Sequence, residues 1–350
     1  MKINEENVSN NSLFEVRKQK LGRLKEKGVN PYPHNYKRSH TSMEAIKLLE
    51  NIESDEDAST KPNVAIAGRL MNVRDMGKVT FVDVQDISGQ IQILLRKNLL
   101  ETDYDLISDL DIGDWIGVSG AVIRTRRGEP SVEANNLVIL CKSLRPLPEK
   151  WHGLTDTELR FRHRHLDLIA NDQARLVART RPQIVSSMRR YLDNTGFIEV
   201  ETPVLVPIAA GAMARPFITH HNQLRRDLYM RIATELYLKR LVVGGLEKVY
   251  EIGKVFRNEG VDLNHNPEFT MLECYEALAD YHDMMDMVEN MIAQISRDVL
   301  KTNIITIKEE NVDLTEPWPR LSLREQLIEH TGVDFIECGN LDSLKAKMNK

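Results

Sequence analysis

The sequence is poor in cysteine and lacks any long apolar run. Three cysteines, Cys141, Cys274 and Cys338, are spread over 350 residues, so a disulfide framework is not expected. No stretch of 18 consecutive apolar residues is present, and the first ten residues, MKINEENVSN, have no apolar signal region. These absences predict a protein of the reducing, cytoplasmic compartment that has no membrane span.

The chain also lacks an excess of positive charge, with 47 Lys and Arg against 52 Asp and Glu. A net charge of −5 argues against nonspecific coating of nucleic acid, which needs a strongly basic domain. Residues 15–27 are a local exception, because they contain six basic residues and only two acids. The apolar positions of this segment have helical spacing. Two interpretations stay open for this helix: a solvated face, or contacts to a phosphate backbone.

Residues 63–147 are expected to form an all-β domain. Five β-rich runs are separated by turn signals such as Met76-Gly77 and Ser88-Gly89, and a short helical piece, DYDLISDL, follows the third run. This order of elements is typical of an OB-fold barrel, a fold that often binds oligonucleotides. An SH3-like barrel is the alternative.

The rest of the chain alternates between helical and β patterns, so the fold class is expected to be α+β. A proline-punctuated linker precedes a helix over residues 156–169. A further helix ends at Gly196 and leads into a strand that stops at Pro203. Thr234 and Gly244-Gly245 are placed to cap and to end another helix. We predict an N-terminal extension over 1–62, the barrel over 63–147, the linker over 148–172 and a second domain over 173–350.

Residues 256–277, FRNEGVDLNHNPEFTMLECYEA, have an unusual density of charge. Strands over 248–259 and 268–277, joined by the turn-rich loop 260–267, predict an antiparallel hairpin. Strand parity places Thr270, Leu272 and Cys274 on a core face. The opposite face holds an arginine, aromatic rings and several carboxylates, including Glu251. Such a face is suited either to a ligand or to cross-strand salt bridges on the surface.

Four stretches resemble a known family. FRNEGVDLNHNPEFTMLE is similar to motif 2 of the class II aminoacyl-tRNA synthetases, and GFIEVETPVL resembles motif 1. Together with RPFITHHNQL and RIATELYLKRLVVGG, the chain looks like a bacterial-type lysyl-tRNA synthetase of subclass IIb from about residue 12 to its end. The resemblance implies an OB barrel that reads the anticodon and an antiparallel sheet with flanking helices that holds the active site.

The resemblance also implies a reaction and a set of residue roles. Lysine and ATP would give lysyl-adenylate, and the lysyl group would pass to the 3′ end of tRNA(Lys), with Mg²⁺ as cofactor and a homodimer as the assembly. Arg257 would contact the α-phosphate and the lysine carboxylate as the catalytic residue. The other implied contacts are to ATP by Glu259, His265, Asn266 and Phe269; to L-lysine by Gly211, Glu235, Glu273 and Tyr275; to the anticodon by Arg74, Phe81, Gln92 and Glu129; and to the partner subunit near Pro203.

The sequence departs from the family pattern in three places. Ala210 stands in a loop that is usually richer in glycine, which removes freedom for positive φ. Thr234 replaces a usual proline. No arginine follows Arg324, and the only later glycines are Gly332 and Gly339, so motif 3 and the magnesium ligands are expected to be absent. We therefore expect the 350-residue chain alone to be inactive. The alternatives are a non-catalytic tRNA-binding remnant and a relative of aspartyl- or asparaginyl-tRNA synthetase.

Overall fold

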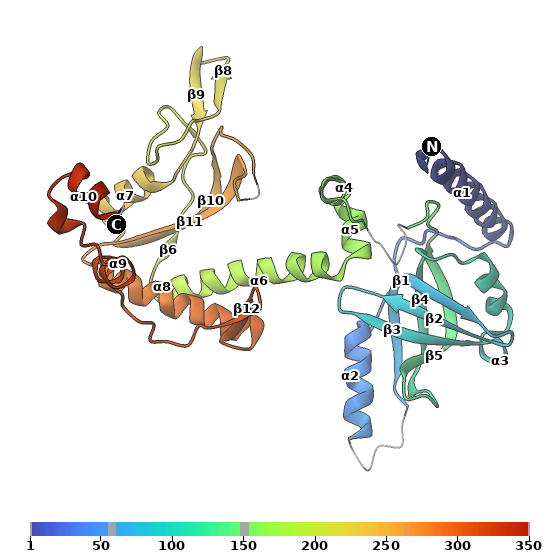
Figure 1. Ribbon diagram of the computed structural model, residues 1–350. Helices are drawn as coiled ribbons and strands as arrows, with labels where there is room; N and C mark the ends of the chain where they lie inside the picture. The colour runs from blue at the N-terminus through green and yellow to red at the C-terminus, as the bar shows by residue number, and fades with distance from the viewer. Residues whose placement is uncertain (1, 55–60, 148–153, 263, 349–350) are drawn as a thin grey trace. The chain divides into compact units, whose positions relative to one another are not determined.

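The chain divides into two compact units, Met1–Ala174 and Arg175–Lys350, which are described separately (Figure 1). The computed structural model describes residues 2–54, 61–147, 154–262 and 264–348. The expected linker over 148–172 falls mostly within the first unit, and its first part, residues 148–153, lies outside the described residues.

A closed five-stranded barrel forms the centre of the first unit, with the strand order β1-β2-β3-β5-β4. Neighbouring strands are antiparallel except β3 and β5, which are parallel. The short α3 and the 3₁₀-helix η1 lie between β3 and β4 in the sequence, where a single helical piece was expected. The strands and these two pieces span β1 Asn63–Asp75, β2 Val79–Gln85, β3 Gln90–Arg96, α3 Lys97–Leu100, η1 Glu101–Asp109, β4 Trp115–Arg124 and β5 Pro130–Cys141.

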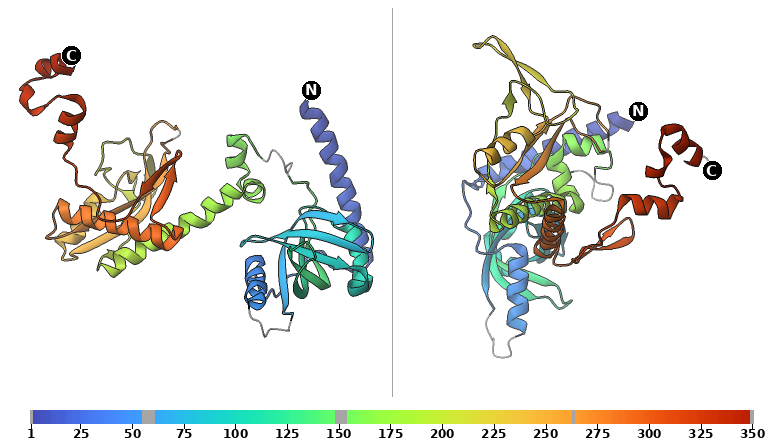
Figure 2. Two further views of the ribbon diagram at one scale, coloured as in Figure 1. Left: turned by 60° about the horizontal axis from the view of Figure 1, so that its bottom comes forward. Right: turned by 90° about the vertical axis from the view of Figure 1, so that its left-hand side faces the viewer.

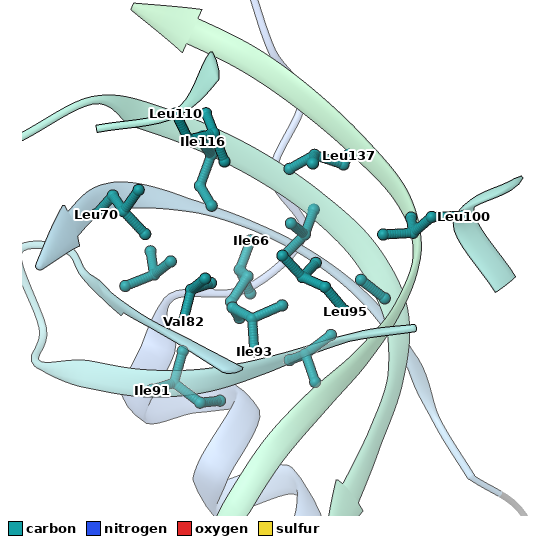
Figure 3. Packing of buried hydrophobic residues seen from close by; sticks show 14 of the residues in the cluster. Ile66, Leu70, Val82, Ile91, Ile93, Leu95, Leu100, Leu110, Ile116 and Leu137 are labelled. Atoms are coloured by element: carbon teal, nitrogen blue, oxygen red, sulfur yellow. The ribbon is translucent and has the colours of Figure 1, made fainter. Parts of the chain in front are cut away.

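The barrel interior is filled by aliphatic side chains from all five strands (Figure 3). Ile66, Val82, Ile93 and Ile116 are fully shielded from solvent. Burial in β2 alternates strictly along the strand, because successive side chains point to opposite faces of the sheet. Phe81 is therefore on the outer face and Val82 on the inner one, so Phe81 is not part of the barrel core.

Helix α2 (Ser42–Glu53) lies against the barrel in both views of Figure 2. Its Ala45 and Leu49 join the barrel core. The helix begins with a capping box, in which the Thr41 side chain and the Glu44 side chain each bond the other residue's backbone N–H.

Helix α1 (Lys2–Glu26) contains most of the basic segment, and four of the six cations in residues 15–27 have partners elsewhere in the first unit. Arg17 donates to the carbonyl oxygens of Ser143 and Arg145. Lys20 pairs with Asp111 at 2.8 Å, and both Arg23 and Lys27 pair with Asp109. These cations attach the helix to the barrel, because Asp109 at the end of η1 and Asp111 just after it give them nearby partners.

The expectation of a single helix over 156–169 is wrong, because the chain forms two shorter helices, α4 (Thr157–Arg162) and α5 (Arg164–Ala170). His163 separates them with φ −110° and ψ 49°. The buried Asp167 carboxylate accepts from Arg160 and Arg164 on either side of the break. Phe161 in α4 is 74% exposed.

The second unit is built on a three-stranded sheet with the order β11-β10-β6. β10 (Lys248–Phe256) is antiparallel to β11 (Glu268–Glu276) and parallel to the two-residue strand β6 (Ile198–Glu199). Helices α6 (Asp172–Asn194) and α8 (Tyr281–Ile295) lie on one side of this sheet, as Figure 1 shows. Their core contacts include Leu192, Met291 and Ile295 from the helices and Tyr250 and Leu272 from the sheet.

Helix α7 (Glu235–Val243) contacts β10 and β11 and ends at Gly244, as expected from the Gly-Gly pair. The remaining elements are β7 Leu205–Val206, β8 Ile218–His221, β9 Arg226–Met230, the π-helical turn η2 Ser296–Leu300, β12 Ile304–Ile307, β13 Glu310–Asp313, α9 Leu323–Thr331, η3 Ile336–Cys338 and α10 Leu341–Met348.

Candidate functional site

The β10–β11 hairpin has the two-faced character that strand parity predicts. Ile252, Leu272 and Cys274 pack on the α6–α8 core. The opposite face, called the ligand face below, consists of Val249, Glu251, Gly253 and Val255 of β10 with Phe269, Met271, Glu273 and Tyr275 of β11. The strand is shorter than expected, because β10 ends at Phe256, and Arg257 and Glu259 belong to the following loop.

Arg257 lies beside Phe269 at the open end of the hairpin. Its guanidinium carbon is 5.2 Å from the centre of the Phe269 ring, a cation–π distance. Its backbone N–H donates to the Pro267 oxygen at 2.8 Å, which holds the loop ends together. The Arg257 Nε is buried and has no hydrogen-bond partner among the described residues. A buried, unpaired guanidinium nitrogen is costly and is suited to receive an anionic ligand.

The loop after Arg257 contains the other residues expected at the nucleotide. Glu259, His265 and Asn266 are exposed. The His265 ring contacts both Asp262 oxygens at 2.8 Å, and the Asp262 carboxylate also accepts from the Asn264 N–H. These contacts hold the pKa of Asp262 below its usual range, the Asn264 bond being the largest cause. The Asp262 carboxylate therefore fixes the conformation of this loop, which sequence reasoning described only as a turn.

The segment that contains Gly211 joins the hairpin at two points. The Asn258 N–H donates to the Arg215 oxygen at 2.7 Å, and the Arg215 N–H reaches the Glu259 carboxylate at 3.4 Å. Gly211 has φ +95°, and a Cβ there would lie 3.3 Å from the Glu235 Cβ. Ala210 is not among the residues with positive φ, so its methyl group causes no strain in the loop.

Glu235, Glu273 and Tyr275 form an acidic group with one aromatic ring. The Tyr275 hydroxyl donates to Glu273 Oε2 at 3.2 Å. Burial raises the pKa of Tyr275, and the Glu273 and Glu235 carboxylates raise it further. Lys239, one turn along α7, pairs with Glu235 at 2.6 Å and lies 5.7 Å from the Tyr275 ring centre. An ammonium group of the protein itself therefore already contacts Glu235 and lies near the Tyr275 ring.

The expectation that Thr234 caps helix α7 is wrong. Thr234 has φ −103° and ψ −10°, and its side chain makes no capping bond. The residue is 3% exposed, and its hydroxyl has no partner among the described residues. Its backbone N–H instead donates to Glu273 Oε1 at 3.2 Å.

A buried ion pair on the ligand face was missed by sequence reasoning, which placed Glu251 on this face without a partner. Arg231 pairs with Glu251, and each is 4% exposed. Thr202 Oγ1 donates to Glu251 at 2.6 Å, and Arg231 donates to the Lys254 oxygen at 2.8 Å. A Cβ on Gly253 would lie 2.2 Å from Arg231 Nη2, so this strand position requires glycine. The pair connects three segments that position the hairpin.

The four residues expected at the anticodon lie together on the outside of the barrel. Arg74, Phe81, Gln92 and Glu129 all line one groove of about 640 Å³. Phe81 is opposite Arg74 on β1 and opposite Leu94 on β3. The Gln92 side-chain oxygen accepts from Ser131 at 3.0 Å, and Arg74 lies 3.4 Å from Asp83. Arg124, Arg126 and Arg127 add positive charge to the same groove.

Two further expectations concern a partner subunit and a metal. Pro203 is exposed between β6 and β7, and the strand expected before it is reduced to two residues. Within the described ranges, no group of three or more His, Cys, Asp or Glu residues is arranged to hold a metal ion. No helix in the same ranges combines the length and the hydrophobicity needed to cross a bilayer.

Both units match models of known protein families. Residues 156–347 match the model described as tRNA synthetases class II (D, K and N), and residues 64–140 match the model of an OB-fold nucleic acid binding domain. The chain belongs to the class II tRNA synthetases. The OB-fold match identifies the barrel as an OB fold and not as the SH3-like alternative.

Curated lysine–tRNA ligases are similar to this class II synthetase chain along most of its length. The ligase of Dehalococcoides mccartyi strain 195 is 51% identical over 94% of the chain, and that of Moorella thermoacetica is 52% identical over 93%. The Bacillus subtilis ligase is 50% identical over 93% of the chain. The chain spans 66%, 65% and 66% of the lengths of these three relatives.

Proposed function

We propose that this chain belongs to a lysine–tRNA ligase that activates L-lysine with ATP and transfers it to tRNA(Lys). The observation that carries the proposal is Arg257, whose buried Nε has no partner and whose guanidinium lies beside the Phe269 ring. This pair offers a cation for a phosphate and a flat apolar surface for a base. The similarity to lysine–tRNA ligases at about 50% identity supports the same assignment.

In the proposed first step, a lysine carboxylate oxygen attacks the α-phosphorus of ATP, and pyrophosphate leaves. Arg257 would neutralise charge on both the carboxylate and the α-phosphate, since phosphoryl transfer depends mostly on positioning and charge stabilisation. Phe269 would stack on adenine, and Glu259, His265 and Asn266 would contact the nucleotide from the loop. The 3′ hydroxyl of tRNA would then attack the lysyl carbonyl and release AMP.

The acidic group would select lysine by charge. Glu235 and Gly211 would receive the α-ammonium group, and Glu273 with Tyr275 would receive the ε-ammonium group. Lys239 supports this assignment, because its own ammonium group already contacts Glu235 and lies near the Tyr275 ring. Two carboxylates and a tyrosine hydroxyl against the single Lys239 cation leave this part of the face net acidic, which favours a cationic amino acid over aspartate or asparagine.

The barrel groove is proposed to bind the anticodon. Phe81 would stack on a base, while Gln92, Glu129 and Arg74 would contact base edges and phosphate. We further propose a cytoplasmic homodimer with Pro203 at its interface. Within the described ranges no group of three or more metal-ligating side chains is present, so no step is assigned to Mg²⁺.

The proposal is tested with an unreactive lysyl-adenylate analogue, lysyl-sulfamoyl-adenosine, by isothermal titration calorimetry. Binding is the suitable measurement, because it reports the contacts of Arg257 directly and does not require turnover. Arg257→Ala should weaken binding by about tenfold to a hundredfold, the range for hydrogen bonds to charged groups. Arg162→Ala, on the exposed face of α4, removes an arginine outside the site and should leave the affinity unchanged.

A folded wild-type chain that does not bind the analogue would contradict the proposal. If that chain still bound an anticodon stem-loop of tRNA(Lys), the result would favour a tRNA-binding protein without amino-acid activation. Equal binding by the wild type and Arg257→Ala would remove the role proposed for Arg257.

A further inference from the structure

Arg231 directly follows strand β9 and bonds to strand β10 through both its backbone and its side chain. Its carbonyl oxygen accepts from the Phe256 N–H at 2.9 Å, and its Nε donates to the Lys254 oxygen at 2.8 Å. Its own N–H donates to the Val204 oxygen at 2.9 Å. The last residues of β10, just before Arg257, are therefore fixed against the segment that contains Arg231.

The Arg231 guanidinium forms a buried network with two further residues. Its Nη1 donates to Glu251 and, at 3.1 Å each, to the backbone and side-chain oxygens of Thr202. The other Glu251 oxygen accepts from the Thr202 hydroxyl at 2.6 Å. Replacing a buried ion pair by apolar residues is often neutral for stability, so the more specific contribution of this pair is the geometry that it imposes on β10.

Arg257 depends on that geometry, because its side chain is held mainly by stacking. The guanidinium carbon lies 5.2 Å from the Phe269 ring centre, and the buried Nε has no hydrogen-bond partner among the described residues. A cation–π contact is weak and fixes a side chain less sharply than hydrogen bonds do. The place of the Arg257 guanidinium therefore follows from where β10 ends.

We propose that Arg231 is a positioning residue, which holds the end of β10 so that the Arg257 guanidinium stays beside Phe269 and faces its ligand. The inference rests on the proposed function for that ligand, the lysine carboxylate and the α-phosphate. Arg231 acts at a distance from the ligand, since its own guanidinium donates to Glu251, Thr202 and Lys254.

The test removes the whole ion pair, because a single substitution would leave one buried charge without its partner. Arg231→Met with Glu251→Met should weaken binding of lysyl-sulfamoyl-adenosine by about tenfold, the cost of misplacing one charged donor. In the Arg257→Ala background the same two changes should weaken binding by less than about twofold, since no guanidinium is left to misplace. Arg297→Met with Glu316→Met, an ion pair elsewhere in the second unit, is the control and should leave the affinity unchanged.

Nuclear magnetic resonance of the whole chain with labelled arginine gives a second measurement that needs no ligand. The Arg257 Nε–H signal is identified by its loss in Arg257→Ala. It should be shifted by the Phe269 ring current, and Phe269→Leu should remove this shift. Removing the Arg231–Glu251 pair should also remove most of the shift, because the guanidinium would no longer be held beside the ring.

Thr202→Val is a milder variant, which keeps both charges and removes the hydroxyl between them. It should weaken analogue binding by about threefold, within the range for one neutral hydrogen bond, and only when Arg257 is present. Equal losses in the wild-type and Arg257→Ala backgrounds would overturn the proposal, and so would an unchanged ring-current shift in the folded pair variant. Failure of the wild type to bind the analogue would refute the proposed function, while the ring-current shift would still decide whether Arg231 positions Arg257.

Discussion

Phe81 shows how one aromatic residue is placed for binding rather than for packing. It is half-buried on the outer face of β2, while its neighbours Val82 and Val84 fill the barrel. The groove that it lines also contains Arg74, Gln92 and Glu129. A ring in this position costs little stability to remove and leaves its face available for a nucleic-acid base.

Phe81→Ala should therefore weaken binding of an anticodon stem-loop of tRNA(Lys) by about 1–3 kcal/mol, the range for one base stacked on an aromatic ring. Fluorescence anisotropy at one fixed salt concentration measures the change, because phosphate contacts make affinity depend strongly on salt. Phe81→Trp keeps an aromatic face and should bind within a few-fold of the wild type. Equal affinities for Phe81→Ala and the wild type would show that the base lies elsewhere in the groove.

Helix α1 is an element whose attachment depends on charge. The Asp109 side chain is 1% exposed and pairs with Arg23 and Lys27. Burial alone would raise the pKa of Asp109, but hydrogen bonds from Lys27 and Arg23 outweigh it and hold the pKa below its usual range. A carboxyl with a lowered folded-state pKa stabilises the protein above its unfolded pKa of about 3.9, and this stabilisation is lost as pH falls through the folded value.

Asp109→Asn should reduce the free energy of unfolding of the first unit by about 1–3 kcal/mol at pH 7. The difference from the wild type should shrink as pH falls below about 4, where the unfolded carboxyl takes up a proton, and it should vanish below the lowered pKa of the folded state. Urea unfolding at pH 7 and pH 3 measures both values. Asp105→Asn, at an exposed position of the same 3₁₀-helix, is the matched control and should be neutral. A pH-independent deficit in Asp109→Asn would mean that the ion pairs do not cause the stabilisation.

The elements that the sequence predicted well are those with a strong local period. The five barrel strands and the β10–β11 hairpin follow from alternation, because one face of each strand is buried. The break at His163 has no glycine or proline signal, and it depends on Asp167 accepting from two arginines. The Arg231–Glu251 pair was also beyond prediction, since the two residues are on different elements and a charged residue on a strand is usually exposed.

The site was predictable to a different degree in each part. The resemblance grouped Phe81 with Arg74, Gln92 and Glu129, and all four line one groove. The contact between Gly211 and Glu235 was also expected only from the resemblance, because 23 intervening residues separate them. The contacts of Asp262 and of the Thr234 N–H could not be predicted from the sequence, since backbone hydrogen bonds of loops leave little trace in residue type.

At the scale of the whole molecule, the two units have separate hydrophobic cores. The barrel core draws on residues between Leu24 and Ile139, and the sheet core of the second unit begins at Ile184. Each unit therefore buries its apolar surface without residues from the other core. This separation predicts two independent unfolding transitions rather than a single cooperative one.

Ile93→Ala removes a fully shielded side chain from the barrel core and should cost about 2–5 kcal/mol. In urea unfolding of the whole chain, followed by circular dichroism, only one of the two transitions should move to lower denaturant. A fragment of residues 1–147 should unfold with the midpoint of that same transition, because it contains the entire barrel core. If Ile93→Ala shifted both transitions equally, the units would be thermodynamically coupled, and binding at the barrel groove would then also affect the stability of the hairpin that contains Arg257.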